Sequence, residues 1–370
     1  MCEVNFLDYF SDLEDPRCDA NKLYPVDEIL LLTLCAVICG ADGWSDVEEY
    51  GDCKIALLRE YLAYGNGIPS DDTLRRFFRA IDNEAFGKMF VRWAGDLHIS
   101  LESGVIAIDG KTSRHSFDND KKALHTVSAF VSEARIVLGQ VKTDEKSNEI
   151  TAIPQLLDLL NVKGGIVTID AMGTQKDIAQ KIIDKGGDYI LALKGNQSSL
   201  HEDIKLFFTD AHLTKSLASH EETDGGHGRI EIRRCMVTDA IDWLKEHHNW
   251  RGLRTIIKIE SEVEIKGQKT FETRYYITSL SPDTIKIATA IRSHWGIENS
   301  LHWVLDMSFG DDQSRIRKGA APENITVIKH LALNLLRKAQ KKRQSIKRLR
   351  KTAGWDDNTL RFIIKNKSMR

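Results

Sequence analysis

The feature that most constrains this sequence is a pair of short apolar runs, each of which ends in an aspartate. Gly104–Lys111 places four apolar residues directly before Asp109 and Gly110. Gly165–Asp170 repeats the pattern, and a second glycine-containing turn follows it. Both runs have the composition of short buried strands. A carboxylate at the edge of a core must be paired, hydrogen-bonded or metal-bound, so two such strands predict one shared cation site.

Length and composition are those of an ordinary globular protein. The chain has 370 residues, of which 42% are hydrophobic and 29% charged, which predicts two domains or one large domain with additions. No apolar run approaches the roughly 18–20 residues that span a bilayer, and the first residues lack the pattern of a signal peptide. The six cysteines form no CxxC pair. We therefore expect a cytoplasmic protein with reduced thiols and no membrane partner.

Charge is informative through its distribution, because the formal net charge is only −2. The stretch from Arg337 to Lys351 carries nine Lys or Arg residues and no acidic residue. Such a block can contact phosphates, or it can be a solvated helix face or a frayed end.

Residues 1–98 have a helical pattern. Ile29–Cys39 is an apolar run typical of a buried helix, and Ser70 can cap a helix that follows it. That helix has an apolar stripe on one side and Arg75, Arg76 and Arg79 on the other. It could read DNA, although most helices of this kind are simply amphipathic surface helices. The change of period places the domain boundary at residues 98–103.

From residue 104 onward, strands alternate with helices. Strands are predicted up to Asp109, over 124–131 and 135–141, up to Asp170, and over 189–193, with helices over 154–160 and 175–185. This β-β-β-α-β-α-β order resembles the ribonuclease H-like fold. In that fold the first and fourth strands are neighbours, which would bring Asp109 and Asp170 together.

Residues 198–282 interrupt the pattern. A helix over 202–208 and strands over 229–237, 255–265 and 271–278 predict a β-rich insertion, with 224–228 as a turn or loop. A long helical region then begins at Pro282. One face of it carries Glu298, with His294 and His302 one turn away on either side.

The acids suit hard divalent cations. Two strand-end carboxylates and a third on a neighbouring helix could hold a pair of Mg²⁺ ions, which promote in-line phosphoryl transfer. Lys111 and Lys194 are candidate phosphate contacts. Each acid also has a simpler interpretation: an aspartate before a glycine is usually a turn residue, and Asp306, Asp311 or Asp312 could take the place of Glu298. A His-Glu-His face could instead bind a transition metal.

Four segments together resemble bacterial insertion-sequence transposases of the DDE type, and most closely the H-repeat-associated group. The resemblance covers nearly the whole chain, and the segments occur in the family's order. They are Ala107–Lys111, Thr168–Gln175, Leu191–Gln197 and His294–Trp303.

The resemblance implies an α/β protein with a ribonuclease H-like mixed sheet and a β-rich insertion, preceded by an all-helical domain. The implied division is a helical, transposase-associated domain (1–98), a catalytic domain (99–345, with the insertion at 198–282) and a basic tail (346–370). It assigns Asp109, Asp170 and Glu298 to the metal-binding triad, with two Mg²⁺ or Mn²⁺ ions. The candidate DNA contacts are Lys111, Lys194, Arg292, His294, Trp295 and His302.

The sequence departs from the pattern of many related transposases around the third acid. These carry Tyr, Arg and Lys seven residues before, four before and seven after the glutamate. Here the corresponding residues are Ile291, His294 and Leu305. Arg292, His294 and His302 are candidates for the missing roles, and the assignment of Glu298 depends most on the resemblance.

The implied activity is hydrolysis of DNA at element ends followed by strand transfer of the 3′-hydroxyl into target DNA. The partners would be terminal inverted repeats and target DNA, bound by a homodimer in the bacterial cytoplasm at the nucleoid. Two alternatives stay open. One is a catalytically silent, transposase-derived DNA-binding protein, and the other is a metal-dependent nuclease without strand transfer.

Overall fold

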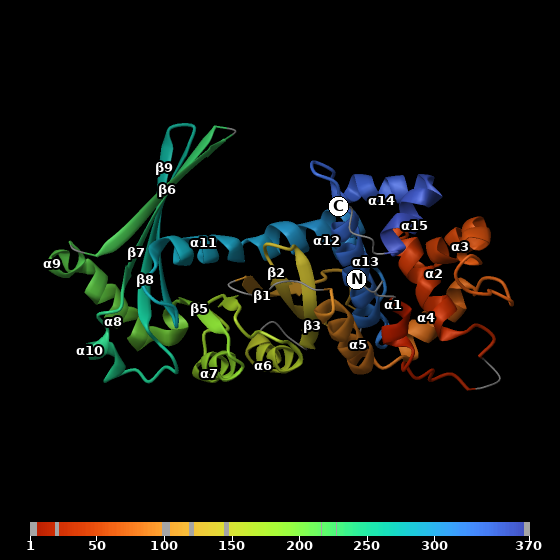
Figure 1. Ribbon diagram of the computed structural model, residues 1–370, viewed down its shortest axis with the longest axis horizontal. Coiled ribbons are helices and arrows are strands. Elements are labelled where there is room, and N and C mark those ends of the chain that lie inside the picture. Colours follow the sequence, from red (N-terminus) through yellow and green to blue (C-terminus); the bar gives the residue numbers. More distant parts are fainter. Residues whose placement is uncertain are drawn as a thin grey trace.

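The computed structural model describes residues 6–18, 22–97, 104–117, 122–143, 148–215, 217–226 and 228–365. A cluster of helices forms one end of an elongated molecule, a mixed sheet lies in the middle, and long antiparallel strands project at the other end (Figure 1). The predicted boundary at 98–103 lies outside the described residues.

The helical end has α2 at its centre. From Ile29 to Ile38 this helix is buried throughout, as its apolar run predicts. α4 begins at Ser70, whose hydroxyl accepts a hydrogen bond from the backbone N–H of Thr73. The N-terminal helices are α1 (Phe6–Phe10), α2 (Val26–Cys39), α3 (Trp44–Leu58), α4 (Asp71–Ala80) and α5 (Asn83–Gly95).

C-terminal helices complete the same core. α13 (Ala321–Ala339) packs against α2, α4 and α5, and its apolar side chains join theirs in one cluster. The segment predicted as a basic tail from residue 346 forms α14 (Ile346–Trp355) and α15 (Asp357–Ile364). Arg350 is buried there and donates two hydrogen bonds to the Val37 carbonyl of α2. Through residue 364 this segment is therefore packed helix and not a tail.

One sheet of nine strands runs through the molecule in the order β3-β2-β1-β4-β5-β9-β8-β7-β6. β1 lies antiparallel to β2 and parallel to β4, so the predicted adjacency of the first and fourth strands is confirmed. The first five strands are β1 (Val105–Thr112), β2 (His125–Val131), β3 (Ile136–Thr143), β4 (Ile166–Ile169) and β5 (Asp188–Leu193).

The prediction that the first strand ends at Asp109 is wrong. β1 continues through Gly110 to Thr112, because its pairing with β2 extends from Ile106↔Val131 to Thr112↔His125. Its parallel pairing with β4 stops earlier, at Ile108↔Ile169. Asp109 therefore lies inside the pairing of β1 with β2 and directly after the end of the pairing of β1 with β4.

Helices cover one face of the central strands. α6 (Glu149–Leu159) and α7 (Lys176–Asp184) share a core with β1, β4 and β5. α6 begins five residues before the predicted Pro154, which lies inside the helix. α7 stops at Gly186, whose φ of 76° is the left-handed conformation expected of a C-terminal glycine.

The predicted insertion continues the main sheet, because β9 pairs antiparallel with β5. It also contains a strand that the sequence did not predict, since β6 extends through the predicted turn at Asp224 to Gly226. Its helices are α8 (Ser198–Thr209), which follows a short 3₁₀ turn at Gly195–Gln197, α9 (Ala211–Thr214) and α10 (Asp242–Lys245), and its strands are β6 (Ala218–Gly226), β7 (Arg229–Thr238), β8 (Thr255–Ile265) and β9 (Gln268–Thr278).

The helical region after Pro282 spans the molecule from the insertion to the helical end (Figure 1). It is not one regular helix. α11 (Thr284–His294) is followed by a π-helical turn, Glu298–His302, then by α12 (Trp303–Phe309) and a 3₁₀ turn, Asp311–Gln313. None of the helices in the described part of the chain is long and apolar enough to cross a membrane.

Candidate metal centre

Asp109 and Asp170 lie on two neighbouring strands, β1 and β4, directly after the last residues that these strands pair. Because β1 and β4 are parallel and their last pair is Ile108↔Ile169, Asp109 and Asp170 follow side by side at the same edge. Glu298 comes from the π-helical turn between α11 and α12, as the long helical region predicted. The structure therefore brings residues far apart in sequence to one end of the parallel strands.

Asp109 carries a poorly solvated carboxylate. Burial raises its pKa from the usual value to about 6, and the charges of Asp170 and Glu149 act in the same direction. The opposing influences are His302 and the backbone N–H of Gly110, which donates to the Asp109 side chain at 2.9 Å. A bound cation would offset the remaining cost of keeping this carboxylate charged.

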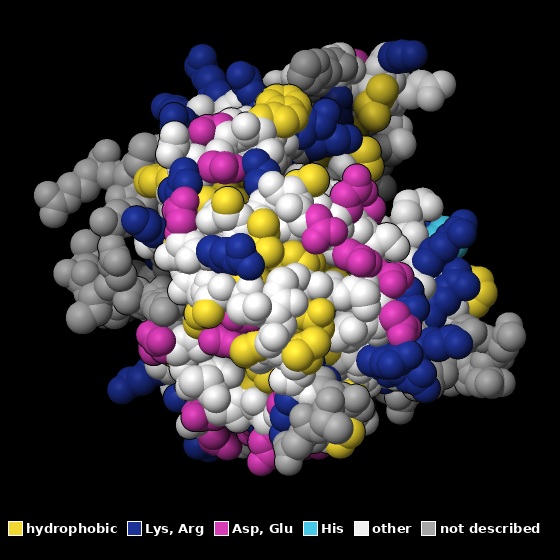
Figure 2. All heavy atoms as spheres, turned by 90° about the vertical axis from the view of Figure 1, so that its right-hand side faces the viewer, with side chains coloured by type: hydrophobic (Ala, Val, Ile, Leu, Met, Phe, Trp, Pro, Cys, Tyr) yellow, Lys and Arg dark blue, Asp and Glu magenta, His cyan; other side chains and the backbone are white. Residues whose placement is uncertain are grey.

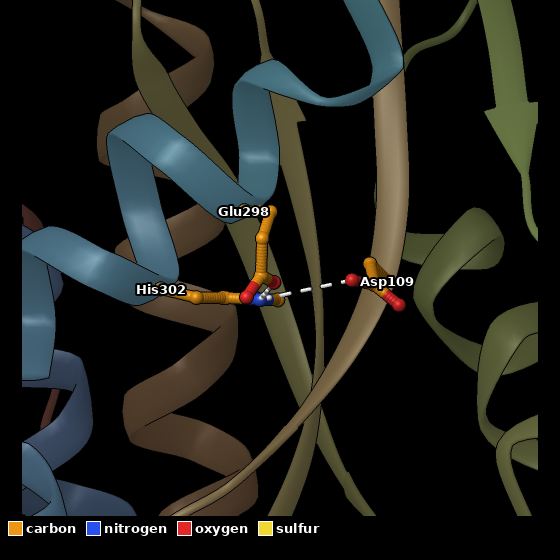
Figure 3. A group of neighbouring side chains, drawn as sticks. All are labelled: Asp109, Glu298 and His302. Atoms are coloured by element: carbon orange, nitrogen blue, oxygen red, sulfur yellow. Dashed lines mark hydrogen bonds and ion pairs between the residues drawn. The ribbon is translucent and has the colours of Figure 1, made fainter. Parts of the chain in front are cut away.

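Glu298 and His302 point together toward Asp109 (Figure 3). His302 Nδ1 lies 2.9 Å from a Glu298 oxygen and 3.7 Å from Asp109 Oδ2. The hydrogen bond from His302 lowers the pKa of Glu298, so this carboxylate is charged and can only accept. The shared proton therefore belongs to His302 Nδ1.

The Glu298–His302 pair lies within the π-helical turn. A π turn is wider than an α turn and is common at functional sites. Glu298 stays exposed, with 56% of its side chain accessible, whereas the His302 side chain is only 6% accessible. The turn thus anchors a buried imidazole beneath an exposed carboxylate.

Ligand atoms of Asp109, Glu298 and His302 all lie within 4.8 Å of one another. The two carboxylates are oxygen ligands that divalent cations accept, whereas His302 Nδ1 carries the proton that it donates to Glu298 and so supports the site from beside it. Burial also disfavours the charged form of Asp109, and a bound cation would offset this cost, which independently supports a metal site. These residues fit a divalent metal, with His302 as an additional neighbour that the sequence did not assign to the metal.

Asp170 is oriented differently from Asp109. Its carboxylate accepts hydrogen bonds from the backbone N–H groups of Met172 and Gly173, at 3.0 and 3.3 Å, and closes the turn after β4. It is not among the three clustered ligands, although its charge raises the pKa of Asp109 and acts on His294.

His294 also faces inward. Its Nδ1 lies 2.9 Å from the hydroxyl of Thr168 on β4, and burial lowers its pKa. A neutral imidazole in this position links α11 to the strand that carries Asp170. The geometry favours a structural role over contact with a phosphate.

The other predicted DNA contacts are spread over the molecule. Lys194 is exposed at the end of β5, and Arg292 pairs with Asp224 of β6. Trp295 is 48% exposed, with the Arg274 guanidinium 5.1 Å from the centre of its ring. Arg292 and Trp295 line one pocket between α11 and the insertion, whereas Lys194 lies apart from it at the end of β5.

Lys111 is enclosed by acids. Its ammonium lies 2.7 Å from Asp306, 3.4 Å from Asp312 and 3.7 Å from Asp311. Asp311 also pairs at 2.7 Å with Lys329 of α13 and accepts a hydrogen bond from Ser113. The three later aspartates, which the sequence left as substitutes for Glu298, thus hold Lys111 in place. Nothing in the local sequence around Lys329 signals this buried contact.

Comparison with known proteins assigns the chain to a protein family. The family model described as "Transposase DDE domain" matches residues 100–335, and the model described as "DDE_Tnp_1-associated" matches residues 7–94. The chain belongs to the DDE transposase family, whose members generally use divalent metals and act on DNA.

Its relatives point to the H-repeat-associated group. The chain is 45% identical over 358 residues to YncI of Escherichia coli O157:H7, covering 95% of this chain and 92% of that protein. It is 41% identical over 366 residues to the H-repeat-associated protein YhhI of strain K12, covering 97% of each. Both names give the transposase assignment as provisional. A piggyBac transposase synaptic complex with hairpin DNA aligns at a TM-score of 0.45 and 10% identity, covering 98% of this chain and 77% of that one.

Proposed function

We propose that this protein is an active DNA transposase that uses Asp109, Asp170 and Glu298 to bind divalent metal. The observation that carries the proposal is the convergence of Asp109, Glu298 and His302, from segments far apart in sequence, beside Asp170. The strand order β3-β2-β1-β4-β5 supports the proposal that the catalytic domain has a ribonuclease H-like fold.

The reaction would be hydrolysis at the element ends, followed by attack of the freed 3′-hydroxyl on target DNA. Bound Mg²⁺ or Mn²⁺ ions would activate the attacking oxygen and stabilise the leaving one. Asp109 and Glu298 would bind the metal directly, and Asp170, whose Oδ1 accepts both backbone N–H groups, would contribute its other oxygen, Oδ2. His302 keeps Glu298 charged and oriented through its Nδ1–H.

The division of the chain at residues 98 and 345, the nucleoid location and the homodimer stay predictions. We infer a homodimer only from the requirement that transposition acts on two DNA ends. The candidate DNA contacts Lys194, Arg292 and Trp295 have exposed side chains. Lys111 and His294 would need to give up their present protein partners before they could contact DNA.

The test is cleavage of DNA that carries the flanking element ends, in the presence of Mg²⁺ or Mn²⁺. We expect the wild type to nick this DNA and to join the 3′ end to a second duplex, and Asp109→Asn and Asp170→Asn to do neither. Nicking without joining would favour the nuclease. Binding without nicking, in the wild type as well, would favour the silent DNA-binding protein.

A further inference from the structure

A groove lies between the helical end and the segment after α12, and the proposed function gives it no role. One wall is formed by Gly310, residues 313–318 and Ala321, and the other by Gly43, Trp44 and Arg75, around a space of about 690 Å³. We call it the basic groove. It is separate from the acid cluster, since none of Asp109, Glu298 and His302 lines it.

Two cations of this segment, Arg315 and Lys318, are available to a ligand. Within the part of the chain that the structure describes, Arg315, Arg317 and Lys318 have no carboxylate within 4 Å, and Arg315 and Lys318 are exposed. Surface cations elsewhere are often paired, as Figure 2 shows for the helical end, where Lys and Arg side chains lie among Asp and Glu side chains. Arg75 on the opposite wall is one of these, since it pairs with Asp71 and Asp72.

The one acid that lines the basic groove does not cancel this charge. Burial raises the pKa of Asp42, while the charges of Arg350 and Lys329 act on it in the opposite direction. Asp42 therefore already has cationic neighbours behind the groove. The positive end of the α13 dipole, at Ala321, adds to the potential of the same wall.

The wall is held rigidly. Arg317 Nε donates to the His115 carbonyl at 2.8 Å, and the Arg317 guanidinium lies 5.1 Å from the centre of the Phe117 ring. The backbone N–H of Ala320 donates to the Arg79 carbonyl of α4, and Gly319 lies so close to Arg79 that a side chain there would collide with it. The backbone that carries Arg315 and Lys318 is therefore already ordered, and little further backbone entropy is lost on binding.

The basic groove is connected to the acid cluster through β1. This strand leads from Asp109 to Thr112, and the Arg114 N–H that follows donates to Asp312 at 3.2 Å. The five residues from Asp109 to Arg114 span at most about 17 Å of extended chain, and Asp312, the partner of Arg114, directly precedes the groove-lining Gln313. That distance corresponds to roughly five base pairs of duplex. A DNA segment of ordinary length can therefore reach both places.

We propose that the basic groove binds the phosphate backbone of duplex DNA outside the acid cluster. The inference rests on the proposed function, because it takes the substrate to be DNA. Arginine suits this task through its planar fork of donors, and cations carried on an ordered backbone would fix the position of the duplex relative to the metal centre without reading bases.

The test is the salt dependence of DNA binding by the double variant Arg315→Ala/Lys318→Ala. Arg317 is left intact because it holds the wall. We expect wild-type affinity for a duplex carrying the element end to fall with NaCl concentration. Removing two phosphate contacts should reduce the magnitude of the log–log slope by about 2 and weaken binding at low salt by tenfold or more.

Two controls make the result specific. Lys163→Ala/Lys245→Ala removes two exposed cations from the connection before β4 and from α10, and should leave affinity and slope unchanged. Arg315→Lys/Lys318→Arg keeps both charges and should restore the wild-type slope. Thermal unfolding of each variant checks that the fold is intact.

The outcomes separate the two proposals. A wild type that binds the duplex with a clear salt slope, and a folded alanine variant with the same affinity and slope, would overturn the basic groove and leave the proposed function standing. A wild type that fails to bind any duplex would overturn the proposed function itself.

Discussion

Asp109 and Asp170 look alike in sequence and differ in structure. Each follows an apolar run and stands before a glycine, directly for Asp109 and three residues later for Asp170. Asp109 lies within a continuing strand and points toward Glu298 and His302, whereas Asp170 is bonded to two backbone N–H groups of its own turn. The difference shows that a strand-end acid can be either exposed to a ligand or held by the local backbone. Mutations can distinguish the roles of Asp109 and Asp170.

The largest expected effect is on catalysis, where the two aspartates should behave alike. If both bind metal during the reaction, Asp109→Asn and Asp170→Asn should each lower the cleavage rate by about 10²–10³-fold or more. Single-turnover cleavage measures this. A Mn²⁺ titration should show the larger loss of affinity for Asp109→Asn, because Asp109 already faces Glu298. Equal activity of Asp170→Asn and wild type would remove Asp170 from the metal centre.

The glycines after the two acids should differ in the cost of an added methyl group. A Cβ on Gly110 would lie against Glu149 and 2.6 Å from His125 Nε2, where these two side chains form a buried pair. Breaking such a pair costs about 3–5 kcal/mol. A Cβ on Gly173 would collide with Ile169 and come within 2.7 Å of Ile153, an overpacking worth about 1–3 kcal/mol. Urea unfolding of Gly110→Ala and Gly173→Ala compares them, and a larger loss for Gly173→Ala would contradict this ranking.

Without metal, removing the two charges should change stability in opposite directions. The folded-state pKa of Asp109 is about 6, above its ordinary 3.8, so its favourable contribution is present at low pH and lost as pH rises through 6. At pH 8 in a chelator, Asp109→Asn should therefore be more stable than wild type, by about 1–3 kcal/mol, and the gain should shrink toward pH 5.

Asp170→Ala should lower stability at pH 8 by about 1–2 kcal/mol, because the N–H groups of Met172 and Gly173 lose their acceptor. Melting curves of both variants at pH 8 and pH 5 test the pair. Destabilisation by Asp109→Asn at pH 8 would mean that its charge is not penalised by burial.

The last expected effect, on metal affinity rather than on stability, concerns His302. Asparagine places an N–H at about the position of Nδ1, so His302→Asn should keep Glu298 oriented and retain most of the activity. His302→Gln, whose amide reaches the position of Nε2, should lose about 10–100-fold in Mn²⁺ affinity. Calorimetric Mn²⁺ titration distinguishes the variants. Equal losses in both would point to direct metal binding by the imidazole.

Much of the sheet could be predicted from the sequence because buried strands have a distinctive composition. The apolar runs before Asp109 and Asp170 indicated two strands, and the element order indicated that they are neighbours, as the parallel pairing of β1 and β4 confirms. The end of β1 was missed because its ladder with β2 outweighs the tendency of Gly110 to break a strand. β6 was missed because it is acidic and glycine-rich, and only its pairing with β7 makes it a strand.

Contacts between distant residues were the least predictable part. The spacing of Glu298 and His302 placed them one turn apart, but the π-helical turn that aims both at Asp109 depends on packing. The pairing of Lys111 with three aspartates nearly 200 residues later has no local signal. Side-chain partners of this kind are set by the tertiary fold and not by period or composition.

The continuous sheet has two very different borders. The border at β3 is closed by α5 and α13, whereas β6 is the last strand at the other border. The closed side is protected by covering atoms, but β6 carries Glu221, Glu222 and Asp224, whose charges discourage another chain from adding to it. Growth of this sheet into an aggregate can therefore proceed in one direction only. The protection in that direction weakens whenever acid or salt weakens the charges.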